Sequence, residues 1–205
     1  ILCLKTWALC FEIIFLTILL SVPQLVWAAN ILDSQVFSVE PAYDLTQRTQ
    51  VSSVLRKVTA RAYFYIDDSW WLSLSSDQQA QVNTALNGLG EEFDTNIYPL
   101  LTQAFGDVWN PGIDKDTRIT IFFHQMKETS GGYINTGDEY YKAQFPGSNE
   151  REMVYLNTAQ VMNPLLKSFL AHELQHLITF NQKERLRGAP EEVWLNEARS
   201  EYALT

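Results

Sequence analysis

Two of the three histidines in the chain lie in one stretch, Ala171-His172-Glu173-Leu174-Gln175-His176-Leu177, which has the form H-E-x-x-H. Residues four apart on a helix project from nearly the same face, with Cβ atoms roughly 5–6 Å apart. The imidazoles of His172 and His176 can therefore hold one cation, and the tetrahedral geometry of zinc suits them. Glu173 lies one step round the helix, where it can take a proton from the attacking water. The alternative is a coincidental pair of helical histidines with separate partners.

The residues on either side of the motif predict two helices. The first begins near Pro164, which suits a first helical turn, and runs to about Lys183. The second runs from Glu191 to Leu204. Its residues that are spaced for packing are Val193, Trp194, Ala198 and Tyr202.

A third zinc ligand is expected on the second helix. Glu197 follows His176 by twenty-one positions, within Asn196-Glu197-Ala198-Arg199-Ser200-Glu201. Two helices joined by a short loop are normally antiparallel neighbours, so Glu197 can return to a metal held by the two histidines. We therefore expect one zinc ion per chain, bound by His172, His176 and Glu197, with a fourth position open to water.

Residues 1–28 are interpreted as a secretory signal. Lys5 precedes an apolar run from Trp7 to Val22, and small residues allow cleavage after Ala28. The run is shorter than the ~20 apolar residues of a membrane-spanning helix, which makes an uncleaved anchor the weaker alternative. The chain has no initiator methionine and ends inside a helical pattern, so we expect it to be a fragment at both ends.

Composition limits the class of protein. Both cysteines, Cys3 and Cys10, lie in the predicted signal, so we expect the mature chain to have neither disulfides nor thiolate ligands. The residues after the signal suffice for one domain with its own core. The formal net charge is −9, and the absence of a basic stripe argues against a nucleic-acid partner. We expect a secreted monomer without stable membrane association after removal of the signal.

The first half of the mature chain predicts strands followed by a long helix. Residues 29–50 are polar and mixed, and are interpreted as a linker or the edge of a pro-segment, with the domain spanning residues 51–205. The segment from Val51 to Ile66 predicts a strand pair or one long strand. Ser75 is a typical N-cap, and the helix that follows it is expected to be kinked or ended by Pro99.

Three further segments predict strands before the motif helix. Their bounds are Arg118–Phe123, Ser130–Asn135 and Met153–Leu156. The paired glycines 131 and 132 are typical of an edge strand that another backbone can approach closely, as an extended peptide would. His124 is interpreted as a structural residue at a strand end. The segment with Asp138, Glu139 and Asn149 is interpreted as a solvated loop in preference to a calcium site.

Taken together, H-E-x-x-H at residues 172–176 and N-E-A-x-S-E at residues 196–201 resemble the gluzincin metallopeptidases. The resemblance implies a role for six side chains. Zinc would be bound by His172, His176 and Glu197, Glu173 would be the catalytic base, Glu201 would support a zinc-bound histidine, and Asn196 would hold the loop geometry.

The longer strings, residues 172–178 and 194–202, look most like the hyicolysin-type secreted bacterial peptidases, and the matching part spans about Asn163 to Ala203. The resemblance implies an α+β, zincin-like metallopeptidase domain. It would contain a mixed sheet, a backing helix and the H-E-x-x-H helix. The C-terminal subdomain that forms the far wall of the cleft in relatives would lie beyond Thr205.

Other zinc peptidase classes lack their required residues here. A metzincin needs Gly and His at the positions of Thr179 and Gln182, and an aspzincin needs an aspartate-containing third-ligand motif. Peptide deformylase needs a cysteine ligand. The expected function is therefore a secreted zinc endopeptidase acting on proteins or peptides. The alternative is a non-catalytic, zinc-stabilised extracellular binding or surface domain.

Overall fold

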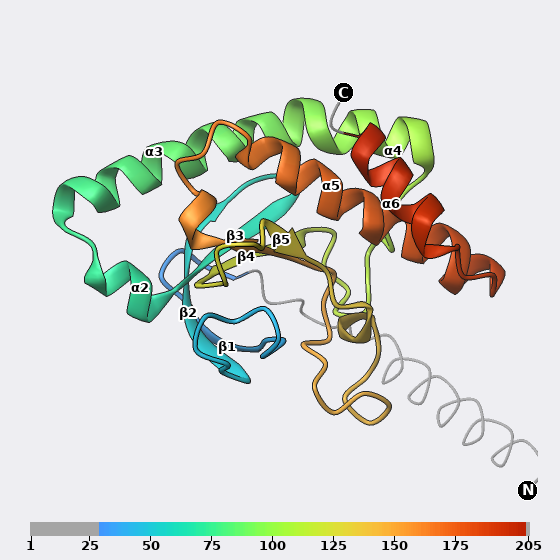
Figure 1. Cartoon of the computed structure of the whole chain (residues 1–205), viewed down its shortest axis with the longest axis horizontal. Coiled ribbons are helices and arrows are strands. Elements are labelled where there is room, and N and C mark those ends of the chain that lie inside the picture. The colour runs from blue at the N-terminus through green and yellow to red at the C-terminus, as the bar shows by residue number, and fades with distance from the viewer. Residues whose placement is uncertain (1–28, 204–205) are drawn as a thin grey trace, which may run out of the picture.

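The computed structural model describes residues 29–203, in which helices pack along one face of a six-stranded mixed sheet (Figure 1). The strand order is β1-β2-β3-β4-β6-β5. The predicted signal at residues 1–28 lies outside the described residues. The protein is thus α+β with a mixed sheet, as the sequence predicts.

The strands at the centre of the sheet are parallel and those at its edges are antiparallel. Their bounds are β1 (Ser34–Ser38), β2 (Gln50–Val58), β3 (Ala62–Asp67), β4 (Ile119–His124), β5 (Gly132–Tyr133) and β6 (Met153–Asn157). The parallel strands β3, β4 and β6 are buried at every position, because both faces of a parallel sheet are covered. The strand predictions for residues 51–66, 118–123 and 153–156 are confirmed, the first as a pair.

Alternate residues of the central strands supply two hydrophobic cores. Ile121 and Phe123 face the helices and share a core with Leu174 of the motif helix. Phe122 and Tyr155 point to the opposite face, where they pack with Phe37. This two-residue alternation is the geometry of a strand, and it fixes which face each side chain of β4 and β6 reaches.

The interpretation of residues 29–50 as a linker is wrong for the segment that forms β1. Ser34–Ser38 pairs with β2 as an antiparallel edge strand, and Phe37 is only 1% exposed. The sequence of this strand does not show the alternation of apolar and polar residues that predicts a strand, because four of its five side chains are polar or exposed, as is common at a sheet edge. Residues 40–48 continue from β1 and pack against the face of the sheet opposite the helices. Tyr43 stacks on Tyr133 there, and Asp44 lies beside His124.

The long backing helix begins where the sequence predicts. Ser75 caps α3 (Ser76–Glu92) in a capping box with Gln78. The helix passes through a π-helical turn, η1 (Phe93–Ile97), and continues as α4 (Tyr98–Phe105). Pro99 therefore does not end the helix: it lies in the first turn of α4, where a missing N–H is tolerated.

The remaining helices lead to the motif and follow it. Their bounds are α2 (Asp68–Ser73), η2 (Thr136–Glu139), η3 (Thr158–Gln160), α5 (Leu166–Thr179), η4 (Phe180–Arg185) and α6 (Val193–Tyr202). Figure 1 shows α5 and α3 on the same side of the sheet, with α6 crossing the end of α5. None of the helices within residues 29–203 is both long and apolar enough to cross a bilayer.

The packing predicted for four residues of α6 is wrong, because all four, including Ala198, are exposed. Val193, Trp194 and Tyr202 are 76%, 69% and 70% exposed. The residue of α6 that is fully buried is Ser200. The face of α6 turned toward α5 is therefore polar, which is consistent with its position beside the histidines.

The segment between β5 and β6 is exposed at residues 140–147, as the sequence indicates, but the interpretation of Asp138 and Glu139 as solvated is wrong. Asp138 and Glu139 are 1% and 5% exposed. The Asp138 carboxylate accepts hydrogen bonds from the Tyr155 hydroxyl at 2.5 Å and the Asn149 backbone N–H at 2.7 Å. Burial, together with the nearby Glu152 carboxylate, raises the pKa of Glu139 to about 9.

Candidate active site

Three side chains from two helices converge at the edge of the sheet. His172 and His176 project from α5, and Glu197 projects from α6. The Nε2 atoms of the two histidines lie 3.0 Å apart, and the carboxylate oxygens of Glu197 lie 3.5 Å and 3.7 Å from them. The structure thus brings together the three residues that the sequence predicts as metal ligands.

The spacing of these atoms fits a tetrahedral zinc site. Zinc lies about 2.0–2.1 Å from nitrogen or oxygen ligands, so two ligands at the tetrahedral angle are separated by about 3.3–3.5 Å. The three observed separations, 3.0, 3.5 and 3.7 Å, fall around that value, the last two being measured to different carboxylate oxygens of Glu197. Two imidazole nitrogens and one carboxylate oxygen also match the donor types of catalytic zinc sites, which keep a fourth position open.

The far nitrogen of His176 is held by α6. His176 Nδ1 lies 3.0 Å from Asn196 Oδ1 and 3.2 Å from Ser200 Oγ. An amide oxygen accepts, so this contact suits the tautomer with the proton on Nδ1, which leaves Nε2 available to a metal in the space shared with His172 and Glu197. Asn196, expected only to hold the loop geometry, therefore contacts the histidine directly.

His172 has a looser arrangement. Its Nδ1 atom lies 3.7 Å from a carboxylate oxygen of Glu201, the residue expected to support a zinc-bound histidine. Partial burial, followed by the neighbouring His176 ring, lowers the pKa of His172. A lowered pKa favours the neutral imidazole, which is the form that binds a metal.

Glycines of the edge strand allow Glu173 to lie close to the sheet. A Cβ atom on Gly132 would come within 2.7 Å of the Tyr155 carbonyl oxygen and 3.0 Å of Glu173 Cγ. A Cβ atom on Gly131 would meet the ring of Phe169 at 2.9 Å. Helix α5 thus approaches β5 closely because both positions lack a side chain. Burial, with Glu197 nearby, raises the pKa of Glu173 to about 8, and a cation held by the two histidines would lower it toward the carboxylate form that a base needs.

These residues line one open cavity with a volume of about 340 Å³. Helices α5 and α6 supply His172, Glu173, His176, Asn196 and Glu197, while the other wall contains Tyr43, Gly132, Tyr133, Ile134 and Thr136. The edge strand β5 and the candidate metal ligands therefore face the same space.

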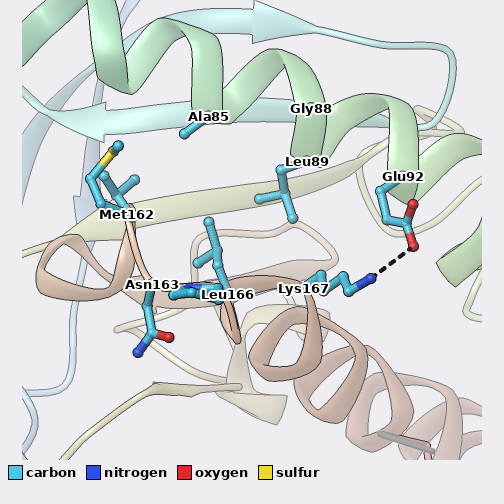
Figure 2. A pocket seen from close by; sticks show the side chains of 10 residues that line it. Ala85, Gly88, Leu89, Glu92, Met162, Asn163, Leu166 and Lys167 are labelled. Atoms are coloured by element: carbon cyan, nitrogen blue, oxygen red, sulfur yellow. Dashed lines mark ion pairs between the residues drawn. The ribbon is translucent and has the colours of Figure 1, made fainter.

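A second groove, of about 370 Å³, lies between α3 and the residues that precede and begin α5 (Figure 2). Its lining includes Leu89, Met162 and Leu166, and the Lys167 ammonium pairs with the Glu92 carboxylate at 3.7 Å. The residues that line this groove include no histidine, and its two charged side chains neutralise each other. The predicted metal ligands and the predicted base line the cavity beside β5 and not this groove.

Two residues of the site were not assigned a role from the sequence. Ser200 is buried against His176, and its position in the N-E-x-x-S pattern is a signal that could have identified it. Tyr43 comes from a segment interpreted as a linker, and no motif connects it with the histidines 129 positions later. His124 is fully buried beside Asp44, at 3.3 Å, and is not among the residues that line the cavity, in agreement with its structural interpretation.

Comparison with known proteins points to a metalloprotease relationship. The chain is 33% identical over 140 residues to the neutral metalloprotease ShpI of Staphylococcus hyicus. The match covers 60% of this chain and 30% of ShpI, so the chain spans less than a third of that relative. No model of a protein family matches the chain.

Proposed function

We propose that the chain is the zincin-like catalytic domain of a secreted zinc endopeptidase of the gluzincin type. The observation that carries the proposal is the convergence of His172, His176 and Glu197 next to the buried carboxyl of Glu173. The similarity to ShpI supports a metalloprotease. The order of residues in segment 1–28 supports secretion, and the resemblance of residues 172–178 and 194–202 supports the hyicolysin type.

The donor set fits one zinc ion per chain. His172, His176 and Glu197 would hold it, with Asn196 and Ser200 orienting His176 and Glu201 beside His172. When bound, zinc would polarise the scissile carbonyl and lower the pKa of a water molecule toward ~7.

The chain's own residues would carry the proton and hold the substrate. Glu173 accepts a proton from the attacking water and passes it to the nitrogen of the leaving amine. Its position between α5 and Gly132 keeps the carboxyl at the edge of the sheet. The outer edge of β5 offers backbone groups to an extended peptide, which would lie along the cavity as an added strand.

The rival function is a non-catalytic extracellular binding domain that uses zinc for stability. Both functions require bound zinc, because both retain the ligands on α5 and α6. Only the peptidase requires Glu173, which is outside the ligand set. The substitution Glu173→Gln keeps the shape of the side chain and removes the base, so it separates the two functions.

The test is an assay of the full-length protein on an unfolded protein substrate, with and without a zinc chelator, beside Glu173→Gln. We expect the parent to be active and the chelator to abolish activity. Glu173→Gln should retain zinc while turnover falls by at least ~10²-fold. Full activity in Glu173→Gln, or no activity in the parent, would exclude the proposed mechanism.

A further inference from the structure

The wall of the cavity opposite the histidines includes a residue from the first part of the domain. Tyr43 lines the same space as His172 and Glu173, and its side chain remains 41% exposed. No metal ligand or proton carrier in the proposed function comes from this segment. Its contribution to the site must therefore be a surface for the substrate or a structural support.

Tyr43 is the outer ring of a stack of three. Its ring lies on that of Tyr133, with centroids 4.6 Å apart and planes inclined by 10°. Tyr133 lies in turn on Tyr155, at 4.4 Å and 4°. Tyr133 and Tyr155 are 5% and 0% exposed, so the two inner rings are enclosed and Tyr43 is the one ring of the three that is largely exposed.

The backbone of Tyr43 is also fixed on both sides. Its carbonyl oxygen accepts a hydrogen bond from the Lys127 backbone N–H at 3.0 Å, and the next residue, Asp44, forms a strand-like bridge with Met126. The fully buried Asp44 carboxylate pairs with the Arg48 guanidinium at 2.8 Å. Tyr43 is thus held in place before any ligand arrives, and such preorganisation lowers the entropic cost of binding.

Charges of both signs lie around Tyr43, and those nearest to it already have partners. Arg48 pairs with the Asp44 carboxylate, and a carboxylate oxygen of Glu40 accepts from the Asn135 side-chain amide at 3.3 Å. The Lys127 ammonium donates to the Ala42 carbonyl oxygen and adds positive charge beside the segment. An aromatic side chain can stack on or meet the edge of the exposed ring without needing a counter-charge.

We propose that Tyr43 forms a subsite for an aromatic side chain of the peptide substrate. The proposal rests on the proposed peptidase function, since it assigns a substrate class to the same cavity. The bound side chain extends the three-ring stack by one ring, while the peptide backbone lies along β5. Residues 40–48 act as one wall of the substrate cleft.

The test measures peptide binding to Glu173→Gln, in which hydrolysis is suppressed, by titration calorimetry. Two series of peptides each place Phe, Ala or Lys at one position, on one or the other side of the scissile bond. We expect a preference for Phe at one position. Adding Tyr43→Ala should lower the Phe-to-Ala affinity ratio there by about 2- to 12-fold, the range expected for one aromatic pair, whereas Tyr43→Phe should keep it.

Control variants and peptides distinguish direct contact of Tyr43 with the substrate from a purely structural role of Tyr43 in the cavity wall. Tyr141→Ala removes another tyrosine that is 53% exposed and does not line the cavity, so it should leave the affinity ratio unchanged. An equal loss of affinity for Phe and Ala peptides in Tyr43→Ala would mean a structural role, and a preference for Lys would mean a cationic subsite; either result overturns the proposal. The parent's hydrolysis of the same peptides tests the peptidase function separately, because discrimination in binding does not require turnover.

Discussion

The close approach of α5 to the edge strand predicts that Gly132→Ala disturbs both stability and catalysis. The new Cβ atom would lie 2.7 Å from the backbone carbonyl oxygen of Tyr155, a distance that real Cβ atoms essentially never show. A backbone atom cannot rotate away, so β5 must move relative to β6. Overpacking of this kind costs about 1–3 kcal/mol of unfolding free energy. That cost exceeds the ~0.4–1 kcal/mol that replacing glycine saves in the unfolded chain.

The same Cβ atom would lie 3.0 Å from Glu173 Cγ and displace the proposed base. Because a misplacement of about 1 Å can reduce a rate by 10²-fold, we expect kcat to fall by about 10- to 10²-fold. Denaturant unfolding and peptide hydrolysis measure the two effects. Gly88→Ala is the matched control, since a Cβ there meets nothing within 4 Å and should raise helix stability by up to about 1 kcal/mol. A Gly132→Ala variant with the stability and activity of the parent would refute this reasoning.

Two further predictions concern the contact behind the histidine and a buried carboxyl. Asn196→Ala removes the nearer of the two partners of His176 Nδ1 and should weaken zinc binding by about 10- to 100-fold in a competition titration with a chelator; unchanged affinity would mean that this contact does not orient the ring. The pKa of Glu139 is raised from 4.5 to about 9 in the folded state, so the folded protein keeps a proton that the unfolded chain releases, and stability falls as pH rises between those values. Glu139→Gln should remove that loss and raise the unfolding free energy at pH 8, on the order of 5 kcal/mol, with no gain at pH 4; an equal effect at both pH values would contradict the assignment.

Much of the fold follows from local patterns in the sequence. The capping box at Ser75 and the apolar run of β4 identify their elements because a short stretch of chain contains the whole signal. The H-E-x-x-H spacing identifies the metal-facing side of α5 for the same reason. Glu197 required one additional step, that a short connection returns α6 to α5, and the structure has that arrangement.

The failures involve residues whose surroundings come from distant parts of the chain. β1 has a polar, exposed pattern, and only its pairing with β2 and the burial of Phe37 make it part of the domain. Asp138 looks like a surface residue until Tyr155 and Asn149 supply its hydrogen bonds. Tyr43 gains its place in the cavity from stacking on Tyr133, ninety positions later. The residue pattern within each of these segments cannot predict contacts with residues that are distant in the sequence.

The most direct test of the metal centre is the zinc content of Glu197→Ala after dialysis, measured beside the parent and Glu192→Ala. Glu192→Ala makes the same change of charge at an exposed position just before α6, outside the ligand set. We predict one zinc per chain in the parent and in Glu192→Ala, and markedly less than one in Glu197→Ala, because two histidines alone leave the site without its third ligand. Tight, stoichiometric zinc in Glu197→Ala would contradict the proposed ligand set.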